Sequence, residues 1–262
     1  MGSAIHGDEA AFGSLPQGGG GPGGSSIQVR ILPCLELGPL YYSINHGVFI
    51  LDESNVTSTD VTNSVFLCPP DPLAGSHNTS YAGCVGSGDY RNHGVLGGEK
   101  PLRLADIRGG LAATVAASED LVGGAGVVAR LRLVYTPDDF TTGPAPASAD
   151  AFAARCGDLV GEVPELGGDT RYYKGFYWTL GVQNITLYNH IITQNKPSYR
   201  TVLRGLRVTT EVASTATSYH PGGVDCLFAD GHLQFVRDLI NSSVWKAIGT
   251  RNAGDVASSG TD

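Results

Sequence analysis

The chain has 262 residues, of which 41% are hydrophobic and 16% charged, so it is long and apolar enough to bury a sizeable core. Its formal net charge of −8, with only 17 Lys and Arg, argues against binding to nucleic acid or to an anionic membrane surface. The 37 glycines favour a loop-rich protein containing a sheet over a helical bundle. No run of about 18 apolar residues occurs, so the chain as given has no predicted membrane span.

The first part of the chain predicts a helix followed by a glycine-rich break. Ile5, Ala10 and Phe12 are separated by polar residues, as in the last turns of a helix, and residues 1–16 are therefore assigned to the end of an N-terminal helix. Residues 17–25 form a Gly-rich linker, which is either flexible or a close-packed surface loop. We assign residues 26–262 to a single globular domain.

Several segments after the linker have the composition of strands. Alternating apolar residues predict a strand at residues 26–32, and residues 33–42 follow as a short helix or turn packed on it. Further strands are predicted at residues 65–68, where prolines end the segment, and at residues 102–107, 114–117, 127–135 and 172–180.

Two helices are predicted in the C-terminal half. Residues 149–160 place Phe152 and Cys156 on one face, with Asp150 as a candidate cap. Residues 243–248 form a shorter helix that begins near Asn241 or Ser242 and ends at Gly249, burying Trp245 and Ile248.

A β-hairpin is predicted near the C-terminus, within residues 220–236. Asp230 and Gly231 separate two short apolar-rich runs, residues 224–229 and 232–236. Because Asp-Gly readily adopts positive φ angles, we expect a type I′ turn at this pair.

The motifs of this C-terminal region occur in a recognisable order. His220, nine further residues and then Asp230-Gly231 are followed by Trp-Lys-Ala-Ile-Gly-Thr-Arg at residues 245–251. This order resembles the C-terminal end of a bacterial prepilin-like family, related to type IV pilins and pseudopilins and named for its H-x9-D-G pattern. Earlier segments resemble the same family in the same order: residues 4–6, 12–16, 29–33, 65–69, 81–83 and 187–190.

The resemblance has implications for fold, location and role. It implies an α+β, pilin-like head with an N-terminal helix remnant on a mainly antiparallel sheet, long loops, a C-terminal hairpin and a short helix. Members begin with a leader and an apolar helix that is absent before Ala4 here, so contact with the membrane is expected only through that missing helix. The resemblance also implies export to the cell surface or beyond, from a precursor anchored in the cytoplasmic membrane.

The role implied is that of a non-enzymatic structural subunit, which self-assembles into a homo-oligomer, a pilus-like filament or a pseudopilus-like filament. The residues that carry the family pattern are His220, Gly222, Gly223, Asp230 and Gly231. Three positions depart from the pattern, namely Cys34, Asp225 and His232.

Metal binding is one interpretation of the polar residues around the hairpin. His220 and Asp230 carry good ligand groups, and Asp225 beside Pro-Gly-Gly could hold calcium together with backbone carbonyls. The simpler interpretation is that Asp230 makes its turn while His220 bonds to nearby backbone. The seven histidines show no spacing typical of zinc sites, so no certain cofactor is predicted.

Cys68 and Cys84 lie 16 positions apart on either side of a loop rich in Pro and Gly. A disulfide between them would close that loop and contribute about 3 kcal/mol. The alternative is a pair of buried thiols.

An aromatic cluster offers a second functional interpretation. Tyr172, Tyr177 and Trp178 could stack on sugar rings or on another subunit, whereas alternate members of a strand would belong to the core. The alternative function is therefore an extracellular module that binds carbohydrate or another solute. A hydrolase is a weaker third option, because it requires a His, a carboxylate and a nucleophile that converge in a cleft.

Overall fold

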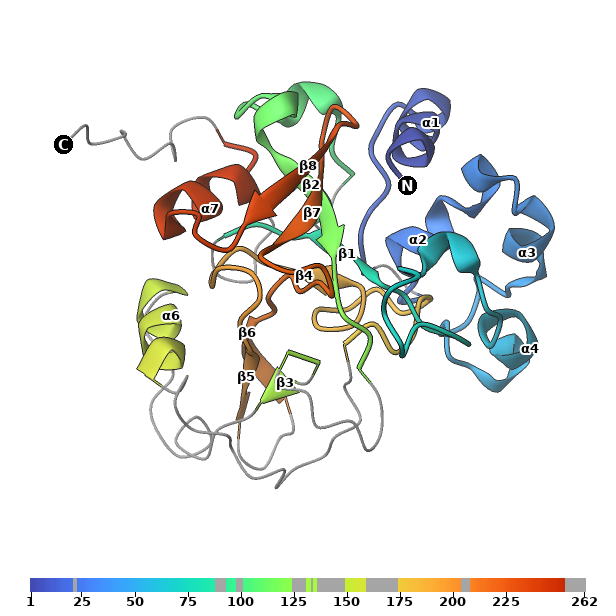
Figure 1. The fold of residues 1–262 in the computed structure, drawn as a ribbon. Helices are drawn as coiled ribbons and strands as arrows, with labels where there is room; N and C mark the ends of the chain where they lie inside the picture. Colours follow the sequence, from blue (N-terminus) through green and yellow to red (C-terminus); the bar gives the residue numbers. More distant parts are fainter. Residues whose placement is uncertain are drawn as a thin grey trace.

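The computed structural model describes residues 1–20, 23–87, 93–97, 101–123, 131–132, 134–135, 149–158, 174–203 and 208–252. They form a mixed α+β fold with a mainly antiparallel five-stranded sheet and a second, three-stranded sheet. Figure 1 shows the N-terminal helices on one side of the five-stranded sheet and α7 on the other, with the small sheet and α6 below. The predicted α+β class is confirmed.

The N-terminal helix α1 (Gly2–Phe12) ends where Gly13 adopts a left-handed conformation, with φ of 72°. Ala4 and Ile5 are buried against the main core, so one face of α1 packs inward. The glycine-rich segment after it is close-packed at Gly18 and Gly19, where an added Cβ would lie 2.3 Å and 2.2 Å from backbone oxygens. At these positions only glycine allows the two chain segments to approach so closely.

The strand predicted at residues 26–32 is wrong, because this segment is helical. The Ser26 side chain accepts a bond from the Val29 amide and begins α2 (Ile27–Arg30). Ile27, Val29 and Ile31 are all buried, since the segment is surrounded by core rather than half exposed on a sheet. The apolar alternation that suggested a strand therefore reflects burial on all sides.

Most of the other described elements in the N-terminal half are short helices. The predicted strand at residues 65–68 is wrong, because 3₁₀ helix η3 (Ser64–Phe66) covers its first half and no strand follows, and residues 102–107 likewise contain a 3₁₀ helix. The predicted helix or turn after residue 32 is confirmed. The short helices are η1 (Leu32–Leu35), α3 (Gly38–Ser43), η2 (Glu53–Asn55), α4 (Val56–Thr59), η3 (Ser64–Phe66), η4 (Leu104–Asp106) and η5 (Leu111–Ala113).

The five-stranded sheet has the order β4-β1-β2-β7-β8. Its strands are β1 (Tyr81–Cys84), β2 (Val115–Glu119), β4 (Leu187–Tyr188), β7 (Gly223–Phe228) and β8 (Leu233–Arg237). Within the described part of this sheet, only the β1–β4 pair is parallel. The strand predicted at residues 114–117 thus becomes the central strand β2, buried along its whole length.

The smaller sheet contains β3 (Val134–Tyr135), β5 (Ser198–Leu203) and β6 (Val208–Ala213). Much of the strand predicted at residues 127–135 lies outside the described residues, and β3 is its described end. Helix α6 (Ala149–Asp158) confirms the predicted helix, with Phe152 and Cys156 buried beside this sheet. Residues 174–180 contain no strand, so that prediction is wrong for the described part.

Side chains of β7 alternate between two cores on opposite faces of the sheet. Leu227 packs with the N-terminal helices, whereas Val224, Cys226 and Phe228 pack on the side of α7 (Ser242–Gly249). The predicted C-terminal helix is confirmed: Asn241 caps α7, and Trp245 is fully buried in the second core. No helix in the described part of the chain has the length and hydropathy required to cross a bilayer.

The hairpin is confirmed, but its turn differs from the one predicted. The Gly231 amide donates to the Phe228 carbonyl at 2.9 Å, so Ala229 and Asp230 occupy the centre of the turn. Gly231 alone has a positive φ there, of 93°. This is a three-residue loop with glycine in the left-handed position, in place of a type I′ turn.

Replacing Gly231 with alanine is expected to lower the free energy of unfolding by about 1–2 kcal/mol, because an L-residue is strained in this conformation. The strain comes from the backbone, since the new Cβ would be 3.6 Å from the His6 ring, an ordinary contact. Urea unfolding would measure the loss. A Gly75→Ala control faces open space and should change stability by less than about 0.5 kcal/mol.

Candidate functional site

Three side chains with strong ligand groups meet at one end of the five-stranded sheet. Cys68 follows η3, Glu119 ends β2, and His220 lies in the turn before β7. Their donor atoms lie within 4.8 Å of one another. We call Cys68, Glu119 and His220 the donor cluster.

Glu119 stands at the centre of the donor cluster. Its side chain is only 7% exposed, and its Oε2 accepts hydrogen bonds from the Ser218 hydroxyl at 2.7 Å and the Asp225 amide at 3.0 Å. Its Oε1 lies 3.4 Å from His220 Nε2 and 3.6 Å from Cys68 Sγ. One oxygen thus fixes the carboxylate in place, while the other faces the thiol and the imidazole.

The arrangement is unsuited to a nucleophilic triad. In such a triad the two ring nitrogens of histidine serve different partners, whereas here His220 Nε2 faces both Glu119 and Cys68, the latter at 3.9 Å. Burial, and then the neighbouring Glu119 carboxylate, raise the pKa of Cys68 to about 11. The thiol is therefore protonated at neutral pH and is a poor nucleophile.

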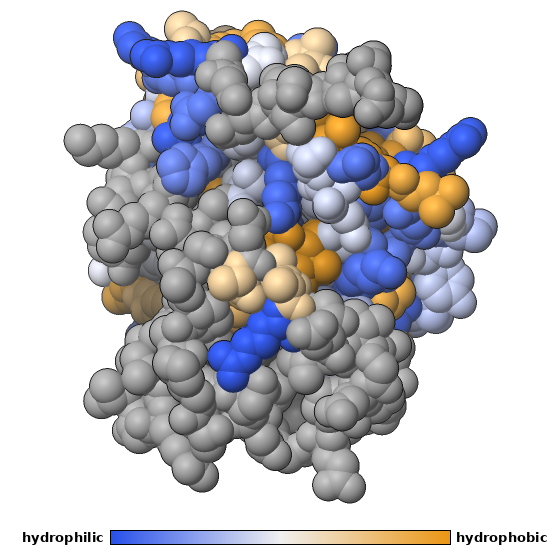
Figure 2. Space-filling model, turned by 90° about the vertical axis from the view of Figure 1, so that its left-hand side faces the viewer, coloured by the Kyte–Doolittle hydropathy of each residue, from blue (hydrophilic) through white to orange (hydrophobic). Residues whose placement is uncertain are grey.

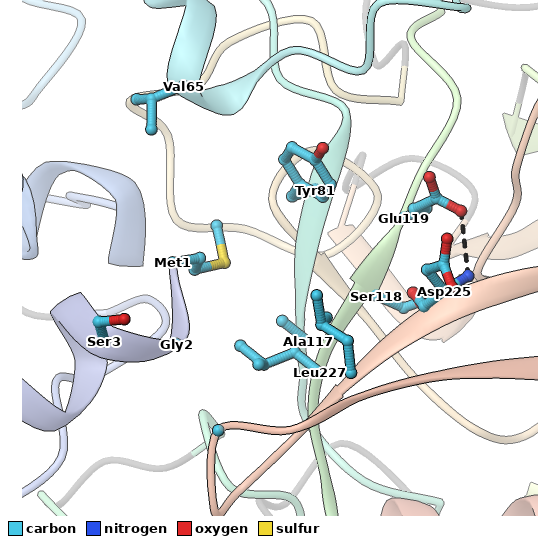
Figure 3. Close-up of a pocket in the computed structure, with 12 residues that line it drawn as sticks. Met1, Gly2, Ser3, Val65, Tyr81, Ala117, Ser118, Glu119, Asp225 and Leu227 are labelled. Atoms are coloured by element: carbon cyan, nitrogen blue, oxygen red, sulfur yellow. Dashed lines mark hydrogen bonds between the residues drawn. The ribbon is translucent and has the colours of Figure 1, made fainter.

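A cavity of about 460 Å³ lies beside the donor cluster, between the start of α1 and the sheet. Figure 3 shows Met1 and Leu227 on its walls, with Glu119 and Asp225 together at one end and Tyr81 nearby. Its volume falls within the usual range of small-molecule sites, about 300–1,000 Å³. The walls are almost equally polar and apolar, and the two carboxyl side chains concentrate the negative charge at one end.

The three proposed metal ligands of the sequence do not form one site. His220 belongs to the donor cluster, but neither Asp225 nor Asp230 does. Asp225 contributes its backbone amide to Glu119 and lines the cavity. Asp230 lies 2.6 Å from the His232 ring at the hairpin tip, as the simpler interpretation of a turn residue requires.

The family-pattern glycines have conformational and packing roles. Gly222 has a φ of 86°, and an added Cβ at Gly223 would lie 2.3 Å from the Val236 carbonyl oxygen across the hairpin. These positions shape the turn before β7, which carries His220.

Of the two interpretations of Cys68 and Cys84, the structure shows the pair of buried thiols and not the disulfide. Cys84 Sγ points into the second core, 3.6 Å from the Gly249 carbonyl oxygen, whereas Cys68 faces Glu119. The sheet therefore directs the two side chains toward different partners.

The aromatic residues singled out from the sequence do not share one role. Trp178 is fully buried, stacked on Phe66 and bonded through its ring N–H to the Val61 carbonyl, so it is a core residue. Tyr177 is half-buried, stacks on His77 and lines a cavity of about 250 Å³. Tyr172 lies outside the described residues.

Sequence reasoning singled out His220 and Cys68, but assigned them to other sites, and it missed Glu119. Glu119 ends a strand whose other residues are small or apolar, and a carboxylate at that position is a recognisable signal. Cys68 lies 51 residues before Glu119 in the chain, and His220 lies 101 residues after it. No local pattern brings them together.

The chain was compared with known families, curated proteins and solved structures. The family model described as "Protein of unknown function (DUF1559)" matches residues 1–243. No curated protein matches the chain. No solved structure matches it either.

Proposed function

The chain belongs to the DUF1559 family, and from this premise we propose that it is a non-enzymatic structural subunit of an extracellular pilus-like or pseudopilus-like assembly. The ordered motifs that resemble prepilin-like proteins support the proposal, as does an N-terminal helix packed on a mainly antiparallel sheet. The subunit would act by self-association at the cell surface.

The observation that carries the proposal is the exposed edge of the sheet. Among the residues that the structure describes, strand β8 pairs only with β7, and its side chains Leu233 and Phe235 are 71% and 42% exposed. Leu239, just beyond the strand, is 95% exposed. An apolar edge strand of this kind favours pairing with another chain.

The register of the hairpin leaves this edge ready to pair. The Phe228 amide donates to the His232 carbonyl and the Asp238 amide to the Gly222 carbonyl, which identifies these as the hydrogen-bonded pairs. By alternation, the N–H and C=O groups of Leu233 and Phe235 turn away from β7. A second copy of the chain could therefore extend the sheet at β8.

Apolar side chains on another side of the molecule are more scattered. In Figure 2, hydrophobic residues form separate groups among hydrophilic ones on the described part of that face. Such dispersed groups are normal on a soluble surface. We therefore base the proposed contact between subunits on the β8 edge, where the exposed side chains are known individually.

Replacing both Leu233 and Phe235 with serine is expected to weaken self-association at least about tenfold, because it removes the apolar part of the edge contact. Sedimentation velocity over a range of concentrations and electron microscopy of negatively stained material would measure this. Tyr42→Ser is a matched control, since Tyr42 is 80% exposed on α3, away from β8. A wild-type protein that stays monomeric at high concentration would contradict the proposal.

The alternative, a module that binds carbohydrate or another solute, is favoured by the two cavities. The smaller one combines the Tyr177 ring with Asp60 and His77, and an aromatic face beside a carboxylate suits a sugar. A monomer that binds oligosaccharides, and loses that binding on Tyr177→Ala, would replace the assembly proposal with this one.

A further inference from the structure

The donor cluster has a geometry that its hydrogen bonds do not explain. Sulfur, nitrogen and oxygen atoms from three distant segments converge on a single point, with separations of 3.4 Å, 3.6 Å and 3.9 Å. Two of these distances involve a thiol, a weak hydrogen-bonding group. The arrangement therefore contributes little as a set of hydrogen bonds.

From this convergence we propose that Cys68, Glu119 and His220 bind one zinc ion through Sγ, Oε1 and Nε2, and that the Cys68 thiol releases its proton to water as the ion binds. Typical zinc bond lengths in tetrahedral geometry place such donors about 3.3–3.7 Å apart. The observed triangle therefore needs adjustments of only a few tenths of an ångström. The site is independent of the proposed assembly role, because all three ligands come from one chain.

The surrounding structure holds the ligands in place. Ser218 uses its hydroxyl both to donate to Glu119 Oε2 and to accept the His220 amide, at 2.7 Å and 3.0 Å. The Asp225 amide provides the second bond to Oε2. Outer contacts of this kind orient metal ligands before the ion arrives.

The donor set selects the class of metal. A thiolate and an imidazole favour zinc and similar transition metals, whereas calcium and magnesium require oxygen donors. The calcium considered from the sequence is therefore not the ion that suits this cluster. Because the His220 side chain is 40% exposed, water can reach the fourth coordination position.

The ion would join segments that are far apart in the chain. Cys68 lies beyond η3, Glu119 ends the central strand, and His220 precedes the C-terminal hairpin. A metal bridging them would fix the hairpin base against the sheet and the N-terminal half. Zinc should accordingly raise the thermal unfolding temperature of the whole chain.

The test uses the purified 262-residue chain, stripped of metal with a chelator and titrated with Co²⁺. We expect one Co²⁺ per chain and a thiolate-to-cobalt charge-transfer absorption, which Zn²⁺ then abolishes by displacement. Cys68→Ser should remove that absorption. His220→Gln and Glu119→Gln should each weaken binding by at least about 10–100-fold, the loss typical of even an outer-contact variant.

The controls are Cys34→Ser, which removes an exposed thiol, and His232→Gln, whose histidine is 40% exposed beside a carboxylate as His220 is. Both should bind Co²⁺ as the wild type does. Near-UV circular dichroism checks that each variant folds. If Cys68→Ser does not fold, His220→Gln becomes the decisive variant, because the His220 side chain is 40% exposed. Absence of the charge-transfer absorption in the wild type, or unchanged affinity in His220→Gln, would overturn the proposal.

Discussion

A Lys174→Met variant is expected to lose about 3–5 kcal/mol of unfolding free energy, a large part of the 5–15 kcal/mol typical of a folded domain. Lys174 is fully buried, and its Nζ lies 2.5 Å from Asp120 Oδ1. It also donates to the Thr215 carbonyl at 2.7 Å and to the Thr217 hydroxyl at 2.9 Å. Methionine fills much of the same volume but provides none of these bonds.

The loss arises mainly from the partner left behind. The Asp120 side chain is 1% exposed, and burial already raises the pKa of its carboxyl. Without Lys174, this carboxyl must either remain charged in an apolar interior or take up a proton. Both alternatives cost free energy that the unfolded chain does not pay.

A second variant separates the charge effect from lost packing. Asp120→Asn combined with Lys174→Met leaves no charge in the pair and keeps an acceptor for the Thr217 hydroxyl. The double variant should therefore be more stable than Lys174→Met alone in urea unfolding. If the two substitutions instead destabilise additively, the pair does not act as a coupled unit.

Local sequence patterns predicted the elements whose stability is local. Helix α7 has its Asn241 cap and a buried Trp245, and the hairpin has Gly231 in the left-handed position. These features depend on neighbouring residues, which a single sequence displays directly. The type of turn was mistaken because Asp-Gly fits both a two-residue and a three-residue loop.

Patterns failed where burial, rather than periodicity, decides the structure. The residues around Val29 alternate as a strand would, yet they form a buried helix capped by Ser26. The aromatic segment that contains Trp178 is a turn packed into the core. Strand propensity reports only that such side chains fit an apolar surface, and loops can provide one as well.

The candidate site was least accessible to sequence reasoning. Its convergence depends on the pairing of β2 with β7, in register between Ser118 and Cys226. That pairing brings Glu119 beside the turn that carries His220, across about 100 residues of chain. Residue types alone identified the histidine and the cysteine as notable, but could not show that they face one carboxylate.

The fold should lose stability in acid through one buried histidine. His190 is fully buried, and its ring stacks on Trp245 with centroids 3.7 Å apart. The ring geometry suits the neutral form: Nδ1 lies 2.6 Å from the Trp245 carbonyl oxygen, while Nε2 is 3.0 Å from the Tyr188 hydroxyl, which can donate to it. Desolvation lowers the pKa of His190 from 6.5 to about 3.

The direction of the pH effect follows from proton uptake. Between pH 6.5 and about 3, an unfolded chain binds a proton at His190 that the native chain excludes. The contribution of the neutral His190 ring to the free energy of unfolding is complete above pH 6.5. It falls toward lower pH, by about 1.4 kcal/mol per pH unit. At pH 4.5 the loss from this group should be about 2–3 kcal/mol.

A His190→Gln variant isolates this contribution, because glutamine does not titrate. We expect the variant to be less stable than the wild type at pH 7.5, since it loses the ring that stacks on Trp245. Between pH 4 and 6, however, the unfolding free energy of the variant should change less steeply with pH, because the variant takes up about one proton fewer on unfolding. Carboxylates titrate in both proteins, so their effect cancels in the difference between the two curves. Parallel curves would mean that His190 gains its proton in the native state as readily as in the unfolded chain, which would contradict the lowered pKa of the buried ring.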